Sequence, residues 1–539
     1  MIWAGLCIAV LVAVSLNRLA AGSFFKPRPG LVEDVFPALC VSLLYFGALL
    51  LTARPVFSLL LAAGGAILLW AVNKVKKELF HEPLTFMDLF LVPQIVRHHR
   101  FYLPYLFPLK VLLPLLGCLG IMAMILILEP PAVSSRLTSA YILMVLLLLL
   151  GGGLLLFSTR SKGGAEAILH NHPLSLGPQE DIQSYGLLGA GFLQALWHRH
   201  LRGKARLPGI SRALKSPPEY IVWPRSSLKP IKVQTAPHII AIQAESFYDL
   251  RTLHPDIEPR MLQNYDRLSR QSCSGKLRVF SHGAYTMRTE FAVLTGSPPG
   301  SLGTDSLNPF HEIARRPAWS MAWHLYREGY NTEFVHPFDL TFFQRHRVMP
   351  NLGFQKLMGA RAFDQEDRFG PYISDMALGK YIFRSLQESR APKFIFGVSI
   401  EAHGPWDGTR YSLLPPGPRP CMPEWGNTQL EIYIRHLKNT DQMLGYLARH
   451  LSQLSRPVIL CIYGDHPGSL PGIYSQTDKE GPYTPYLLWS TAWKGRQGCK
   501  IDLLPQELGG KILTAALENA AAKNHFAGVR GQESGFMGQ

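Results

Sequence analysis

Five long apolar runs in the first third of the chain limit its possible folds more than any other feature. They contain few or no charged residues and cover about residues 2–17, 35–52, 56–73, 111–128 and 138–157. A helix of about 20 apolar residues crosses the roughly 30 Å hydrocarbon core of a membrane. We therefore predict a transmembrane region of five helices over residues 1–158. The first run lacks the basic segment that opens a signal peptide, which favours a retained anchor.

The chain changes character after the last apolar run. Residues 159–234 are rich in Arg, Lys, Pro and Ser and include the amphipathic stretch "IQSYGLLGAGFLQALWHRH". This composition predicts a juxtamembrane linker with interfacial helices beside anionic headgroups, and a plain solvated linker is the alternative.

Residues 235–520 alternate short apolar runs with amphipathic stretches. Four of the apolar runs, "HIIAIQAES", "YNTEFVHP", "KFIFGVSIEAHG" and "PVILCIYGDHPG", are typical of buried strands. Strands that alternate with helices predict an α/β domain with a mostly parallel sheet between layers of helices. The last residues, 521–539, are predicted to form a flexible tail.

The basic residues leave two questions about partners and orientation. The formal net charge of +16 permits nucleic acid, but the sequence contains no zinc-finger, RNP-type or basic-helix motif, so we expect anionic lipid instead. The loop between the third and fourth apolar runs holds Lys74, Lys76, Lys77, Arg97 and Arg100. The positive-inside bias would place this loop and the large domain in the cytoplasm. Part of the same loop, "EPLTFMDLFLVPQIVRHHRFYLPYLF", is also apolar enough to lie in the membrane interface.

Polar side chains of metal-ligand type follow the four predicted strands. They are Glu245, His336, His403 and the pair Asp465 and His466. In open α/β sheets, ligands bind beyond the carboxyl ends of the strands. Each residue alone is also compatible with a helix cap or a hydrogen-bonded histidine of the fold. Together they predict a site for one divalent ion, with Mn²⁺ first and Mg²⁺ or Zn²⁺ as alternatives.

The stretch "HGAYTMRTEF" places Thr286 after a glycine-containing turn and before a helix-forming run. A threonine there is often a helix cap, and it could also be the group that reacts. A bound cation would lower the pKa of its hydroxyl, and the helix N-terminus with Arg288 would favour a phosphate beside it. Cap and nucleophile are compatible roles in this interpretation.

These motifs, in this order behind five apolar runs, resemble the lipoteichoic acid synthase family and its relative, the membrane phosphoglycerol transferase of periplasmic glucans. Both belong to the alkaline phosphatase/sulfatase superfamily. The resemblance covers nearly the whole chain and rests on Glu245, the Thr-x-x-x-Glu-Phe context of Thr286, "HPFDLTFFQR", "HGPW" and "YGDHPG". It implies that Glu245, Thr286, Asp465 and His466 bind the metal, and that Thr286 is also the nucleophile.

The resemblance also implies the substrate contacts. His336 and Arg345 match a spacing of substrate-binding residues, and Phe343 stands where the lipoteichoic acid enzymes have Trp. His403 matches a histidine held near the leaving or attacking oxygen. Some members have Gly-Lys-Thr where this chain has Ala284, Tyr285 and Thr286. The identities of the acceptor and of the transferred headgroup therefore stay open, and they can differ from those of such members.

The implied reaction transfers glycerophosphate from phosphatidylglycerol through a phospho-threonine intermediate to an extracytoplasmic glycan or polyglycerophosphate. The implied location is the bacterial cytoplasmic membrane, with several spans and the catalytic domain outside, against the positive-inside count. Three alternatives remain. A phosphoethanolamine transferase shares the ligands, a sulfatase needs a C/S-x-P-x-R motif that "TMRTE" lacks, and a non-catalytic membrane scaffold predicts eroded ligands, whereas all are present.

Overall fold

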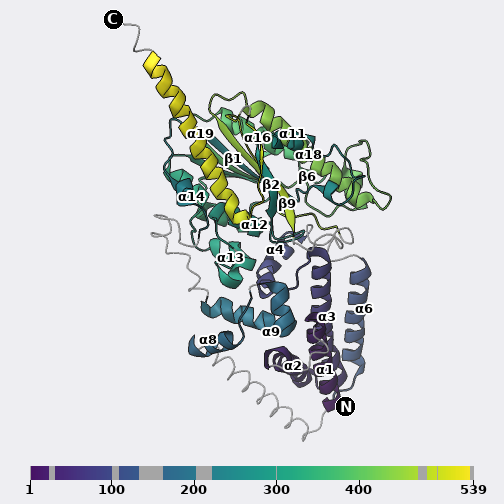
Figure 1. Ribbon diagram of the computed structural model, residues 1–539. Coiled ribbons are helices and arrows are strands. Elements are labelled where there is room, and N and C mark those ends of the chain that lie inside the picture. Colours follow the sequence, from purple (N-terminus) through teal and green to yellow (C-terminus); the bar gives the residue numbers. More distant parts are fainter. Residues whose placement is uncertain are drawn as a thin grey trace. The chain divides into compact units, whose positions relative to one another are not determined.

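The computed structural model forms two compact units (Figure 1). The first comprises Met1–Ala205 with Gly303–Asp305, and the second Arg206–Leu302 with Ser306–Gln539. The predicted domain boundaries at 158, 234 and 520 remain predictions. The structure describes residues 2–22, 31–99, 109–132, 162–175, 177–201, 221–298, 300–470, 482–493 and 496–533.

Three apolar segments of the first unit are long enough to cross a membrane, namely Ile2–Ala20, Val32–Thr52 and Pro55–Phe80. They are helical and overlap the first three predicted spans. The fourth predicted span lies in helix α6, whose described apolar part, Leu116–Leu128, is shorter. The fifth, 138–157, lies outside the described residues. The structure therefore has three candidate membrane-spanning helices among its described residues, and the five predicted transmembrane helices remain a prediction.

The helices of the first unit follow the apolar runs and the amphipathic stretches. Pro55 stands in the first turn of α3, where its missing N–H has no partner to lose, and Ala53 before it turns the chain with φ 54°. The helices of this unit are α1 (Ile2–Ala20), η1 (Leu31–Val35), α2 (Phe36–Thr52), α3 (Pro55–Phe80), η2 (Phe86–Leu91), α4 (Val92–Arg97), α6 (Leu109–Leu128), α8 (Lys162–Asn171) and α9 (Pro178–Leu201).

Small residues let α1 and α2 approach closely. Ala9 and Ala13 of α1 pack in one buried cluster with Tyr45 and Phe46 of α2. A Cβ on Gly5 would lie 2.8 Å from the Tyr45 hydroxyl oxygen, which donates a hydrogen bond to the Ile2 carbonyl. In a membrane, lipid tails are as apolar as the side chains, so the hydrophobic effect does not drive helices together. Close packing at small residues is then a main source of helix association.

A buried ion pair organises the segment after α3. Lys76 Nζ lies 2.6 Å from Asp88 Oδ2 and donates a second hydrogen bond to the Pro83 carbonyl. Asp88 also caps η2 together with Thr85. Lys76 is therefore paired with an acidic partner, but it still counts toward the positive-inside bias of this loop, because that bias counts Lys and Arg and is not a net-charge rule.

The second unit is built on an eight-stranded sheet with the order β10-β2-β9-β8-β1-β7-β3-β4. The four predicted strands are confirmed as β1, β3, β7 and β8, which pair in parallel at the centre. Only β9 runs antiparallel to its neighbours β2 and β8 in this described sheet. The strands are β1 (His238–Ala244), β2 (Cys273–Arg278), β3 (Asn331–Val335), β4 (Lys356–Met358), β7 (Lys393–Val398), β8 (Val458–Gly464), β9 (Tyr483–Ser490), β10 (Cys499–Lys500), and a separate pair of β5 (Arg368–Phe369) and β6 (Tyr372–Ile373).

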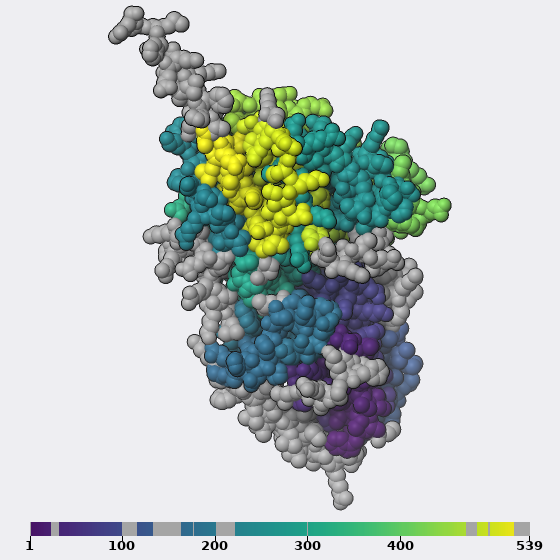
Figure 2. Space-filling model, viewed as in Figure 1, coloured from purple at the N-terminus to yellow at the C-terminus, as the bar shows by residue number. Residues whose placement is uncertain are grey.

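Helices cover both faces of this sheet (Figure 1). Alternate residues Ile240 and Ile242 of β1 pack into one core with α16 and α18, as the period of two in a strand requires. On the other face, α12 packs against α19, which lies along the surface of this unit (Figure 2). The helices are η3 (Arg225–Leu228), η4 (Leu250–Thr252), α11 (Gln263–Ser269), α12 (Thr286–Thr295), η5 (Gly303–Leu307), α13 (Pro309–Ile313), α14 (Met321–Arg327), η6 (Phe342–Gln344), α15 (Arg345–Asn351), η7 (Ala360–Ala362), η8 (Gln365–Asp367), α16 (Asp375–Gln387), α17 (Gly408–Leu413), α18 (Thr428–Leu451) and α19 (Pro505–Glu533).

Candidate active site

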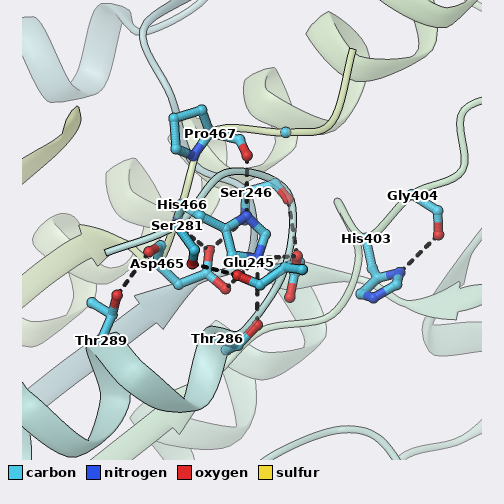
Figure 3. Close-up of polar contacts among 12 residues, drawn as sticks. Glu245, Ser246, Ser281, Thr286, Thr289, His403, Gly404, Asp465, His466 and Pro467 are labelled. Atoms are coloured by element: carbon cyan, nitrogen blue, oxygen red, sulfur yellow. Dashed lines mark hydrogen bonds and ion pairs between the residues drawn. The ribbon is translucent and has the colours of Figure 1, made fainter. Parts of the chain in front are cut away.

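Thr286 is the first residue of α12 and is buried. The N-cap position belongs to Tyr285, which has a left-handed backbone with φ 63° and makes no capping side-chain hydrogen bond. The interpretation of Thr286 as a cap is therefore wrong, because this residue lies inside the helix. Its Oγ1 instead lies 3.4 Å from His466 Nε2 (Figure 3).

The turn before Thr286 is packed against the segment that follows β8. Gly283 has φ 61°, and its N–H donates to the Pro467 carbonyl at 2.9 Å. A Cβ at this position would lie only 2.5 Å from Ser469 Cβ, so a larger residue would push the two segments apart. Glycine here lets the start of α12 reach the end of β8.

Three predicted metal ligands meet at this point. Glu245 follows β1, and Asp465 and His466 follow the neighbouring parallel strand β8, so their side chains share one edge of the sheet. All three residues are buried, and one ligand atom from each lies within 4.8 Å of the others. His466 Nε2 is 3.2 Å from Asp465 Oδ2 and 3.8 Å from Glu245 Oε1 (Figure 3).

The hydrogen bonds of the cluster fix which atoms face its centre. His466 Nδ1 lies 3.1 Å from the Pro467 carbonyl, which can only accept, so Nδ1 carries the proton and Nε2 keeps its lone pair. Asp465 Oδ1 accepts from the backbone N–H groups of Ser246 and His466, at 2.8 and 2.9 Å. Asp465 Oδ2 accepts no hydrogen bond from the described residues.

The electrostatics of the cluster fit a divalent cation. A lone pair, two carboxylates and a hydroxyl oxygen converge in a buried space, which is unfavourable unless a positive charge lies among them. Burial, and then the neighbouring Asp465, raise the pKa of Glu245 well above its ordinary value. The mixed oxygen and nitrogen set of Glu245, Asp465, His466 and Thr286 suits Mn²⁺, Zn²⁺ or Mg²⁺.

Supporting residues that no sequence motif indicates hold Glu245 in place. The Glu245 N–H donates to Ser399 Oγ at 3.0 Å, and Ser246 Oγ donates to Glu245 Oε1 at 2.9 Å. Tyr433 of α18 donates to the Ser246 carbonyl at 2.5 Å. Serines and tyrosines are common throughout the chain, so nothing in their spacing marks these three.

His336 and Arg345 lie together with Glu290, a third residue for which the sequence predicts no role. Arg345 Nη2 lies 2.8 Å from Glu290 Oε2, and both side chains are fully buried. Arg345 Nη1 lies 3.3 Å from His336 Nε2, whose Nδ1 lies 2.9 Å from the Val398 carbonyl. Burial, and then the Arg345 charge, lower the pKa of His336 well below its ordinary value, so the ring is neutral. The Thr-x-x-x-Glu spacing is the only signal that could have indicated Glu290.

The two other predicted substrate residues, Arg288 and Phe343, have different neighbours. Arg288 donates from Nε to the Leu307 carbonyl at 2.9 Å, and its guanidinium lies 4.0 Å from the centre of the Tyr285 ring. Phe343 is buried with φ 51°, and its ring lies 5.3 Å from the Arg345 guanidinium. Their contact with a substrate remains a prediction.

His403 lies beside the metal-ligand cluster, after β7 (Figure 3). Its Nδ1 lies 2.7 Å from the Gly404 carbonyl, which assigns the proton to Nδ1 and the lone pair to Nε2. Burial lowers the pKa of His403 to about 3, and the nearby Arg410 and His466 also lower it. The ring is therefore neutral and able to accept a hydrogen bond.

The family comparison agrees with this architecture. The family model described as Sulfatase matches residues 237–499, so this part of the chain is a sulfatase-family domain. It contains Thr286, the three candidate metal ligands and His403.

Two curated relatives come from Rhizobium meliloti (strain 1021). Capsular polysaccharide biosynthesis protein RkpI is 28% identical over 432 residues, which are 79% of this chain and 76% of that protein. A putative cyclic beta-1,2-glucan modification protein is 28% identical over 288 residues, which are 49% of this chain and 44% of that protein.

Solved structures give more distant matches. The Streptococcus pyogenes phosphoglycerol transferase GacH, in complex with sn-glycerol-1-phosphate, has 20% identity and a TM-score of 0.43, over 56% of this chain and 83% of that chain. The lipoteichoic acid synthase LtaP from Listeria monocytogenes has 19% identity and a TM-score of 0.42, over 55% of this chain and 78% of that chain.

Proposed function

We propose that the chain is a membrane-anchored phosphoglycerol transferase. It moves glycerophosphate from phosphatidylglycerol, through a phospho-threonine intermediate, to an extracytoplasmic glycan or polyglycerophosphate. The observation that carries the proposal is the position of Thr286 at the start of α12, with its hydroxyl beside the buried cluster of Glu245, Asp465 and His466. Apolar helices that can anchor the chain suit a lipid donor. The names of both curated relatives support a glycan as acceptor.

In the first step, Thr286 Oγ1 forms a bond to the phosphorus of the lipid, and the bond from phosphorus to the diacylglycerol oxygen breaks. A divalent cation held by Glu245, Asp465 and His466 would lower the pKa of the threonine hydroxyl and offset phosphate charge. The threonine proton leaves with the diacylglycerol, whose oxygen must be protonated. The N-terminus of α12 supplies a further positive field for the phosphoryl oxygens.

In the second step, an acceptor hydroxyl attacks the same phosphorus, the bond from phosphorus to Thr286 Oγ1 breaks, and the proton of the acceptor hydroxyl passes by way of His403 to the Thr286 oxygen. The lone pair on His403 Nε2 can accept the hydrogen of the attacking hydroxyl, and a nearby phosphoryl anion would raise the basicity of this neutral ring. Two displacements of moderate difficulty replace one difficult transfer. Arg288 is the proposed partner of the phosphoryl oxygens, and Phe343, His336 and Arg345 shape the wall beside them.

Mass spectrometry of the purified full chain tests the reaction. The protein is incubated with Mn²⁺ and either phosphatidylglycerol or phosphatidylethanolamine, and the peptide that contains Thr286 is examined. A glycerophosphoryl adduct on Thr286 from phosphatidylglycerol is the expected result. A phosphoethanolamine adduct would replace the proposal by the alternative headgroup, and an unmodified Thr286 with both lipids would overturn the phospho-threonine mechanism.

We place the chain in the bacterial cytoplasmic membrane, with several spans and the catalytic domain on the outer face. A reporter fused after Gln539 tests this orientation. A phosphatase that works only in the periplasm should be active there, and a fluorescent protein that matures only in the cytoplasm should stay dark. The opposite pattern would reject both the orientation and an extracytoplasmic acceptor.

A further inference from the structure

Arg410 of α17 is a buried cation that no part of the proposed mechanism uses. Only 4% of the Arg410 surface is exposed. Nη2 donates to the Glu401 carbonyl at 2.5 Å, and Nη1 donates to the carbonyls of His403 and Pro405. One guanidinium thus joins three carbonyl groups of the loop that carries His403. A rigid fork of donors is the geometry that makes Arg, and not Lys, suitable for such a role.

The same guanidinium also acts on the His403 ring through an aromatic neighbour. It lies 5.0 Å from the centre of the Tyr372 ring, and the Tyr372 ring packs edge-on against the His403 ring at 6.1 Å. Arg410 therefore restrains His403 from two sides, through the backbone carbonyl and through the face of Tyr372.

The first residue of the loop is anchored separately. Glu401 is fully buried, and its Oε1 lies 2.9 Å from His436 Nδ1 and accepts from Asn439 Nδ2 at 2.7 Å. Its Oε2 accepts from the Asp375 N–H at 2.7 Å. Residues of α16 and α18 fix the side chain of Glu401. The path of the chain from Glu401 to Pro405 then depends on the groups that bind the backbone carbonyls of this loop. Arg410 is the described side chain that does so.

We propose that Arg410 is a positioning residue for His403. It holds the loop from Glu401 to Pro405 so that the lone pair of His403 Nε2 stays beside Thr286 and the metal-ligand cluster. This inference rests on the proposed function, in which His403 assists the second displacement. Arg410 contacts no reacting atom in this scheme and acts only through His403.

A double-mutant cycle separates positioning from general stability. The full chain is first charged on Thr286 with phosphatidylglycerol, and the decay of the adduct is followed after addition of an acceptor sugar. Arg410→Ala should slow decay by about 10²-fold, the effect of a small misplacement of a catalytic group. In a His403→Ala background the same change should slow decay by no more than about twofold, because residues that act as a unit are not additive. Equal factors in both backgrounds would overturn the proposal.

Arg435 offers a matched control, since it also donates to a backbone carbonyl, that of Pro415, and lies over an aromatic ring, that of Phe369. Arg435→Ala should leave adduct decay near the wild-type rate. Arg410→Lys, which keeps the charge but not the fork, should give an intermediate rate and serves if Arg410→Ala does not fold. A loss in Arg435→Ala as large as in Arg410→Ala would also count against the proposal.

Chemical modification tests the inference without any turnover. Diethyl pyrocarbonate reacts with histidine rings, and the rate at His403 can be read by mass spectrometry of the full chain. His403 should react several-fold faster in Arg410→Ala and Arg410→Lys than in the wild type or in Arg435→Ala. An unchanged rate at His403 would overturn the positioning role. If no adduct forms on Thr286 in the wild type, the proposed function fails, while this measurement still decides the role of Arg410.

Discussion

Two clusters of buried charged side chains lie near the same edge of the sheet, and their charges are balanced differently. In the compensated cluster, Glu290 and Arg345 form an ion pair at 2.8 Å. In the uncompensated cluster, Glu245 and Asp465 face each other beside the lone pair of His466. Buried charges are costly unless they are paired or bind a metal.

This difference separates a structural role from a ligand-binding role. The compensated cluster has its balancing charge within the chain, so it can be stable without any ligand. The uncompensated cluster raises the pKa of Glu245 and leaves Asp465 Oδ2 without a hydrogen bond from the described residues. It therefore gains most from a cation that comes from outside the chain.

The largest effect is expected at Thr286, whose hydroxyl oxygen lies 3.4 Å from His466 Nε2 of the uncompensated cluster. Thr286→Ala should lower transfer by roughly 10³-fold or more, as the loss of a nucleophile does, while stability changes by about 1 kcal/mol at most. The measurements are adduct formation and thermal unfolding of the full chain. The control is Thr295→Ala in the same helix, whose hydroxyl donates to the Phe291 carbonyl and accepts from the Ser297 N–H, away from the uncompensated cluster. Near-normal transfer by Thr286→Ala would remove the nucleophile from the mechanism.

The second effect concerns the two carboxylates of the uncompensated cluster. Asp465→Asn or Glu245→Gln should lose bound metal and activity together, by about 10²-fold or more in affinity, because the removed charge binds the ion. Metal content is measured on the purified protein by elemental mass spectrometry. Asp441→Asn is the control, since Asp441 is equally buried but is satisfied by the N–H groups of Asn264 and Tyr265. Unchanged metal content in both variants would move the metal site elsewhere.

The uncompensated cluster is predictable from sequence because its members follow strongly apolar runs. Parallel strands end at one edge of the sheet, so Glu245 and the Asp465–His466 pair meet once β1 and β8 are recognised. This prediction requires only that the two strands be neighbours in the sheet, and it does not require the structure of any loop. The nucleophile needs more, since the contact of Thr286 with His466 depends on the packing of Gly283 against Ser469.

The compensated cluster is much harder to predict. Glu290 lies in a helix and Arg345 begins another, 55 positions along the chain, so no periodic pattern connects them. Their pairing follows from tertiary packing around β3 and α12. The helix-cap interpretation of Thr286 fails for a local reason instead: Tyr285 takes the N-cap position with a left-handed backbone, which its side chain does not favour.

A third effect tests the compensated cluster through stability. Glu290→Gln should destabilise the full chain by about 3–5 kcal/mol, because it leaves the Arg345 charge buried without its partner. The double variant Glu290→Gln with Arg345→Met should recover much of this loss, since it removes both charges. Thermal unfolding measures both, and metal content should stay at the wild-type level. A destabilisation that the second substitution deepens would show that the ion pair is not the source of the effect.

The last effect concerns how stability changes with pH and involves a third pair of buried carboxyl groups, Asp375 and Glu401. Burial, and then the neighbouring Glu401, raise the pKa of Asp375 to about 8, and burial raises the pKa of Glu401 to about 7. An unfolded aspartate has a pKa of about 3.9. Between about pH 4 and pH 8 the folded chain therefore binds more protons than the unfolded chain, and stability falls as pH rises.

Asp375→Asn should make this fall shallower, by up to about 1.4 kcal/mol per pH unit over that window, because one titrating group is lost. The Thr440 hydroxyl, which donates to Asp375 Oδ2 at 2.6 Å, can donate to an amide oxygen in the same place. Thermal unfolding of the full chain from pH 5 to pH 9 measures the slope. The stability of the variant relative to the wild type should be higher at pH 9 than at pH 5. A wild-type slope in the variant would mean that Asp375 is already ionised in the folded chain, with its charge balanced as in the compensated cluster.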